Sequence, residues 1–89
     1  MRAFLTVFAE DQIGIIAKVS TLLAEQSVNI LDINQTVMQE FFTMSMLVDT
    51  GKCPLPFTEL AALLKKKGEE WGMDIRMQRE DIFNSMHRI

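Results

Sequence analysis

The spacing of the apolar residues switches repeatedly between two periods along this chain, and the order of the switches leaves few folds open. A period of two indicates a strand, and a period near 3.6 indicates a helix. The helical period occupies residues 13–26 and 57–71. The alternating or continuously apolar segments, which we expect to form strands, occupy residues 3–9, 30–38, 41–49 and 73–78.

These segments follow one another as strand, helix, strand, strand, helix, strand. This β-α-β-β-α-β order predicts a ferredoxin-like α+β fold, in which a four-stranded antiparallel sheet carries both helices on one face. The 89 residues suffice for one such domain, because two separate cores would each be too small to be stable. We therefore expect a single domain over residues 1–89, with its core in residues 2–79 and a C-terminal helical extension in residues 80–89.

Several local signals refine this prediction. Asp11 offers a carboxylate that can cap the first helix. Gln39 and Glu40 form a polar dipeptide between two strands and predict a hairpin turn, although the usual Asn-Gly signal is missing. Gly68 lies on the apolar stripe of the second helix, which predicts a close approach to the sheet, and Gly72 predicts the end of that helix.

The sheet should keep one apolar face that two helices cannot cover. The large side chains that exceed the capacity of the helices are Phe4, Phe8, Leu31, Val37, Phe41 and Leu47. An exposed face with several of them would be larger than the apolar patches usual for monomers. Asp81 can cap a short helix whose apolar residues are Ile82, Phe83, Met86 and Ile89. We expect either this C-terminal helix or a second copy of the chain to cover the face.

Composition and charge exclude several classes of partner. The net charge is −3, and the lysines of residues 65–67 are followed almost at once by two glutamates, so they indicate a solvated helix face rather than a nucleic-acid-binding surface. The apolar stretch between Arg2 and Glu10 is too short for a signal peptide or a membrane span. Cys53 is the only cysteine, which leaves no internal disulfide and favours a reducing cytoplasm.

The sequence also lacks the patterns that common enzyme sites require. It contains no glycine-rich phosphate loop, no HExxH and no CxxC, so we expect no cofactor and no metal site. Acylphosphatases share this fold but need an arginine in the first strand-to-helix turn, and residues 10–14 contain none. His87 is the only histidine and lies near the chain end, while Cys53 lies in a loop without a neighbouring base. We therefore expect the chain not to be an enzyme.

Two short motifs lie at the first strand-to-helix turn and at the start of the second predicted strand. They are FAEDQIGII at residues 8–16 and VNI at residues 28–30. The first resembles the pattern of Asp or Asn, two variable residues, Gly and an aliphatic residue in ACT domains, which are the regulatory modules of aspartate kinase, chorismate mutase and related amino-acid enzymes. The second resembles the start of the second ACT strand. Each motif is weak alone, but both occur at the right places in a βαββαβ order.

A narrower resemblance covers almost the entire chain. The segments that carry it are DINQTV at residues 32–37, FTM at residues 42–44 and DIFNSM at residues 81–86. They resemble a small family of stand-alone ACT proteins of bacteria and archaea that have no attached catalytic domain. This resemblance implies a fold and a class of ligand, but no pathway.

The resemblance to amino-acid-binding ACT domains implies a ligand site between two subunits, built from the first strand-to-helix turn of one and the second strand of the other. Carried over to this sequence, the ligand-binding residues are Asp11, Gln12, Ile13, Gly14, Ile15, Asn29 and Ile30. The amides at the helix start would hold the ligand carboxylate, while Asp11 and the Asn29 side-chain oxygen would accept from its ammonium group. Some serine-binding members have a histidine where this chain has Ala9, which argues against serine as the ligand.

Three of these site residues also have a purely structural explanation. Gly14 would allow helix and strand to pack closely, Asp11 would only cap the helix, and Asn29 would only form a turn. Two functions therefore stay open. The first is a regulatory module that binds an amino acid as a homodimer, and the second is a ligand-free adaptor that uses the same surface to dimerise or to dock another protein.

Overall fold

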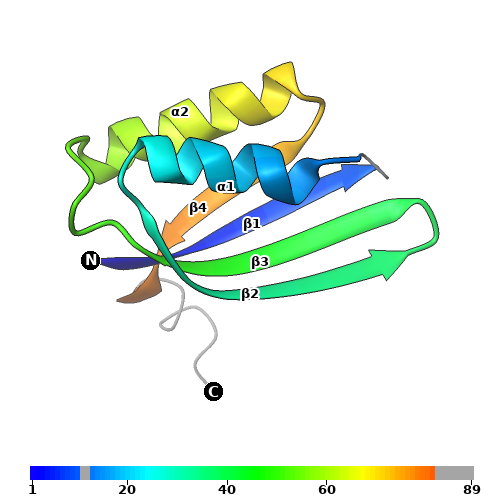
Figure 1. The fold of residues 1–89 in the computed structure, drawn as a ribbon, viewed down its shortest axis with the longest axis horizontal. Coiled ribbons are helices and arrows are strands. Elements are labelled where there is room, and N and C mark those ends of the chain that lie inside the picture. Colours follow the sequence, from blue (N-terminus) through cyan, green and yellow to red (C-terminus); the bar gives the residue numbers. More distant parts are fainter. Residues whose placement is uncertain (11–12, 82–89) are drawn as a thin grey trace.

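The computed structural model of the chain describes residues 1–10 and 13–81, and its elements follow the predicted order (Figure 1). The strands are β1 (Arg2–Glu10), β2 (Asn29–Met38), β3 (Phe41–Asp49) and β4 (Asp74–Arg79). The helices are α1 (Ile15–Glu25) and α2 (Phe57–Glu70). Neighbouring strands are antiparallel in the order β2-β3-β1-β4, and both helices lie on one face of the sheet. The ferredoxin-like prediction is confirmed.

The core lies between the helices and the facing side of β1, β3 and β4. The strand residues buried there alternate with exposed ones and are Ala3, Leu5, Val7, Ala9, Met44, Met46, Val48 and Ile75. The helices contribute Ile15, Val19, Leu22, Leu23, Leu60 and Leu64. Burial of one such large side chain stabilises the fold by about 1.5–3 kcal/mol. Burial along these strands therefore follows the period of two from which the strands were predicted.

The close approach of α2 to β4 depends on Gly68. A Cβ atom at this position would lie 2.8 Å from Ile75 Cγ1 and 3.0 Å from the carbonyl oxygen of Met73, so no side chain fits without movement. The helix ends at Glu70, and Gly72 follows with a φ of 73°, in the left-handed region that glycine adopts most easily. Both glycine predictions are confirmed.

The hairpin between β2 and β3 turns at Gln39 and Glu40, with Met38 opposite Phe41. Gln39 has a φ of 56°. A two-residue hairpin loop of this kind needs left-handed backbone, which Asn-Gly usually supplies and which Gln39 adopts here. The predicted turn is confirmed despite the unusual residues.

The start of α1 differs from the prediction. Its N-cap is Gly14, which has no side chain to accept a hydrogen bond, and the predicted cap Asp11 lies outside the described residues. Ile16 is 38% exposed, whereas Ile15 and Val19 are buried. The part of α1 that is buried is therefore narrower than the apolar side of the helix, because Ile16 lies at the edge of that side.

β2 is an edge strand and contains no buried residue. Val37 was expected on the uncovered face of the sheet. It pairs instead with Phe42 on the side that carries the helices, so this expectation is wrong. It is nevertheless 64% exposed, because neither helix extends over the hairpin end of the sheet (Figure 1). Leu31 lies in a register shift between Ile30 and Asp32 and is also exposed.

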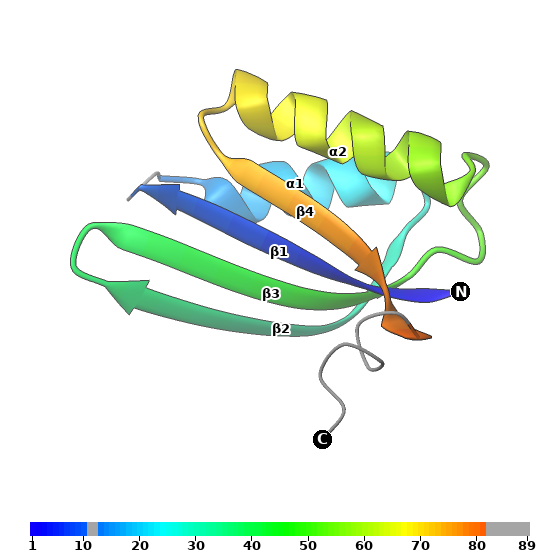
Figure 2. The same cartoon turned by 180° about the vertical axis from the view of Figure 1, so that it is seen from behind.

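The other sheet face carries a partly exposed aromatic pair. Phe8 and Phe41 stack with ring centroids 5.7 Å apart and remain 48% and 37% exposed. Figure 2 shows the strands in front of α1, and no helix of residues 13–79 covers them from this side. The apolar residues expected to cover this face are Ile82, Phe83, Met86 and Ile89, and they lie outside the described residues.

Candidate functional site

The first half of the predicted site is the turn between β1 and α1. Ile13 is 98% exposed there, and Gly14 has a φ of 82°. A Cβ atom at Gly14 would have no heavy atom within 4 Å, so close packing does not explain this glycine, and the left-handed backbone does. Asp11 and Gln12 lie outside the described residues.

The start of α1 offers backbone groups rather than side chains. Lys18 N–H donates to Gly14 O at 2.9 Å, which is the first hydrogen bond of the helix. The amides that precede Lys18 have no acceptor within the helix, and such amides favour an anion. The Ile15 side chain is buried in the core, so this residue has only its amide to offer a ligand.

The second half of the predicted site surrounds Asn29, the exposed first residue of β2. It opens on a cavity of about 450 Å³ lined by Ser27, Val28, Asn29, Asp49, Gly51 and Lys52. The sheet register places Asn29 directly opposite Asp49. Ile30 is half-buried and packs against the core. The cavity therefore combines a carboxylate, an ammonium group and a side-chain amide.

The Asp49 carboxylate is held in its charged form. The Gly51 N–H donates to Asp49 Oδ1 at 2.9 Å, which lowers the pKa of this carboxyl below its ordinary value. The ammonium group of Met1, at 3.5 Å from the same oxygen, acts in the same direction. Asp49 is therefore negatively charged at neutral pH and suited to a cation.

One copy of the chain does not bring the two halves together. Asn29 lies at the end of the sheet where Asp49 also pairs with Arg2, whereas the turn at Gly14 follows Glu10 at the other end. Between them runs α1, whose eleven residues span about 16 Å. The structure thus groups Asn29 with Asp49 and Lys52, which the sequence reasoning missed, and separates it from Gly14.

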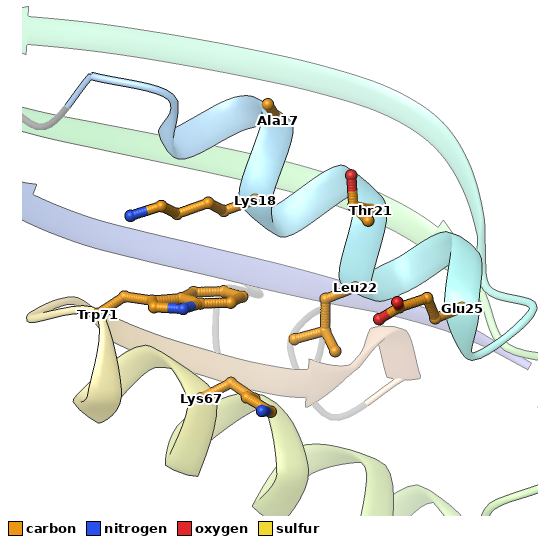
Figure 3. Close-up of a pocket in the computed structure, with 7 residues that line it drawn as sticks. All are labelled: Ala17, Lys18, Thr21, Leu22, Glu25, Lys67 and Trp71. Carbon is orange, nitrogen blue, oxygen red and sulfur yellow. The ribbon is translucent and has the colours of Figure 1, made fainter.

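A second concave site, also missed from the sequence, lies between α1 and α2 (Figure 3). Its volume is about 400 Å³, and its lining consists of Ala17, Lys18, Thr21, Leu22, Glu25, Lys67 and Trp71. Lys18 Nζ lies over the Trp71 ring, 5.9 Å from the centroid. Helical spacing in the sequence could have indicated part of this site, because Lys18, Leu22 and Glu25 are spaced to lie on one side of α1.

Two kinds of feature are absent from residues 1–10 and 13–81. These residues contain no group of three or more His, Cys, Asp or Glu side chains that could hold a metal ion. No helix within the same part of the chain is long and apolar enough to cross a membrane.

The chain is similar to small proteins of bacteria and archaea over its whole length. A UPF0237 protein of Clostridium acetobutylicum is 49% identical over 89 residues, which cover 100% of both chains. A UPF0237 protein of Methanocaldococcus jannaschii is 47% identical over 88 residues, which are 99% of this chain and 98% of that protein.

Solved structures show the same likeness. An ACT domain protein from Streptococcus pneumoniae is 38% identical, with a TM-score of 0.84 over 93% of each chain. The regulatory subunit of aspartate kinase from Thermus thermophilus, in its ligand-free form, is 25% identical with a TM-score of 0.66, over 86% of this chain and 50% of that subunit. The sequence profile of the ACT domain matches residues 2–78. The chain therefore belongs to the ACT domain family, among the small UPF0237 proteins.

Proposed function

We propose that this protein is a ligand-sensing regulatory module that works as a homodimer and whose effector is an amino acid or a similar small zwitterion. The observation that carries the proposal is the cavity at Asn29, where Asp49 and Lys52 present opposite charges. The Asp49 carboxylate, which already faces the ammonium group of Met1, can also accept from that of a ligand, and the positive charge of Lys52 favours a ligand that carries a carboxylate as well. The volume of about 450 Å³ is ample for an amino acid.

The dimer supplies the part of the site that one chain lacks. β2 has an unpaired outer edge of ten residues without lysine or proline, the residues that usually protect such an edge. Two β2 strands that pair antiparallel across a two-fold axis bring the start of one beside the end of the other. The partner's Asn29 would then approach the turn at Gly14. Within one copy, Gly14 and Asn29 are separated by about the length of α1.

In this arrangement each group of the ligand has a counterpart. The amides of residues 12–15 hold the carboxylate at the start of α1. The Asn29 side-chain oxygen and the Asp49 carboxylate of the other copy accept from the ammonium group, and Asp11 adds a further negative charge.

The relatives support regulation rather than catalysis. The solved relative from Thermus thermophilus is a regulatory subunit of an enzyme, and the matching profile is that of a regulatory domain. We propose accordingly that the chain is not an enzyme, needs no cofactor and acts in the cytoplasm on a protein partner, without binding nucleic acid or membrane.

A thermal-shift screen of the free amino acids tests the proposal. A ligand present at about 100 times its dissociation constant stabilises the fold by roughly 2.7 kcal/mol, enough for a clear rise in Tm. Asn29→Ala should remove much of this rise and leave the ligand-free Tm almost unchanged, because Asn29 is exposed at the end of a strand. Lys66→Ala, at an exposed position of α2 outside both the cavity and β2, is the control and should keep the full rise.

The second candidate is the ligand-free adaptor. The feature that favours it is the exposed Phe8 and Phe41 pair, which offers an apolar docking surface on the open sheet face. If no amino acid raises the Tm of the wild-type protein, the adaptor is the better explanation and Asn29 is only a residue of the turn before β2.

A further inference from the structure

The groove between α1 and α2 differs in chemistry from the cavity at Asn29. Leu22, a core residue of α1, lies between the Trp71 ring at one end and the Glu25 carboxylate at the other (Figure 3). Lys18 enters from α1 and Lys67 from α2. A groove of about 400 Å³ with an apolar floor and a few polar groups on its rim has the composition of a small-molecule site.

Trp71 provides a flat surface in this groove. Its side chain is half-buried and packs against the core, which fixes the position of the ring. The Lys18 ammonium group already lies on the ring face at 5.9 Å, the position that an attractive cation–π contact requires. A planar ligand ring can stack on the same indole when the exposed Lys18 side chain moves aside to the rim of the groove, because aromatic rings prefer offset stacked contacts.

The charges of the groove favour a monoanion. Lys18 and Lys67 provide two ammonium groups against the single carboxylate of Glu25, although the chain as a whole is acidic. Lys67 pairs with Glu70 only at 3.9 Å, and both side chains are about half exposed, so this pair is weak and leaves Lys67 able to turn toward a ligand. Glu25 would repel a doubly charged anion.

We propose that the α1–α2 groove is a second binding site, separate from the amino-acid site, and that it takes a small aromatic carboxylate. The ligand ring stacks on Trp71, and its carboxylate accepts from Lys18 Nζ and Lys67 Nζ. The buried Leu22 side chain forms the apolar floor and excludes water from one edge of the ring.

The chain contains its own probe for this site, because Trp71 is its only tryptophan and it has no tyrosine. Benzoate is titrated into the wild-type protein while the fluorescence of Trp71 is excited at the red edge of the indole band, where benzoate does not absorb. The expected result is a saturable change. Benzamide, the uncharged analogue, should bind about tenfold more weakly or worse, and phenyl phosphate should also bind more weakly than benzoate.

Two variants locate the charges. Lys18→Gln and Lys67→Gln should each weaken benzoate binding about tenfold. Lys66→Gln makes the same change of charge at an exposed position of α2 outside the groove and should leave the affinity unchanged. Circular dichroism of the three variants checks that the fold is intact.

The proposal is overturned if benzoate gives no saturable change, if benzamide binds equally well, or if Lys66→Gln has the same effect as the two groove variants. Failure here is distinct from failure of the amino-acid site, because Asn29→Ala should leave the benzoate titration unchanged. The thermal shift by amino acids should likewise survive Lys67→Gln.

Discussion

Replacement of Gly68 by alanine tests the packing of α2 on β4. In a solvent-exposed helix position the same change would stabilise the fold by about 1 kcal/mol, because alanine is the better helix former. Here the new Cβ atom would lie 2.8 Å from Ile75 Cγ1 and 3.0 Å from Met73 O, and Ile75 is itself buried. The Met73 N–H also donates to Gly68 O at 2.7 Å, so the helix end cannot move without loss of this bond. Overpacking of this kind costs roughly 1–3 kcal/mol, and because the helix end cannot move we expect a cost in the upper part of that range, about 2–3 kcal/mol. After subtraction of the gain of about 1 kcal/mol in helix propensity, the expected net loss is about 1–2 kcal/mol.

Urea denaturation at fixed protein concentration measures this loss in the free energy of unfolding. In a separate thermal denaturation the Tm should fall by roughly 5–15 °C. Lys66→Ala, at an exposed position of the same helix, is the control and should change the free energy of unfolding by less than about 0.5 kcal/mol. Ile75→Ala removes the nearest atoms, so the double variant should be more stable than the sum of the two single losses predicts. A Gly68→Ala protein as stable as the wild type, or more stable, would refute the close contact.

Three further predictions concern assembly, the C-terminal tail and pH. Light scattering at micromolar concentration should report about twice the chain mass of 10.2 kDa, and a clean monomer would contradict the shared amino-acid site. Truncation after Arg79 should lower the Tm by many degrees or dissociate the dimer, because burial of three apolar tail residues stabilises by about 1.5–3 kcal/mol each; an unchanged Tm would mean that the tail is a passive extension. Since the pKa of Asp49 is lowered, its stabilising effect is present above the ordinary aspartate pKa and is lost as the pH falls through the lowered value. Asp49→Asn should therefore flatten the acid side of the Tm profile, and a profile parallel to that of the wild type would show that this carboxylate has no such effect.

The strands and their faces could be predicted because burial on a sheet alternates strictly with sequence position. Leu5, Val7, Met44 and Met46 all face the core as the period of two requires. Gly68 was equally informative, because a glycine on an apolar helix stripe has few explanations other than close approach.

The features that the sequence could not predict depend on how far one element extends over another in the folded protein. Val37 lies on the helix side of the sheet and is still exposed, since its burial depends on how far the helices extend over the hairpin. The start of α1 was placed too early, because apolar spacing continues through the left-handed turn at Gly14.

The candidate sites were predictable only in part, for the same reason. The resemblance to ACT domains pointed to Asn29, but only the register of β2 with β3 brings Asp49 opposite it. The groove joins Lys18 to Trp71 across two helices that are far apart in the sequence, so no local pattern could indicate their contact.

The separation of Gly14 from Asn29 by the length of α1 has a thermodynamic consequence. A ligand that contacts both ends must hold two copies together, so binding and association become linked by mass action. The apparent affinity for the effector then falls on dilution of the protein, and addition of the effector shifts the population from single chains to pairs. Such a module responds to its own abundance as well as to that of its ligand, without any change in the shape of either subunit.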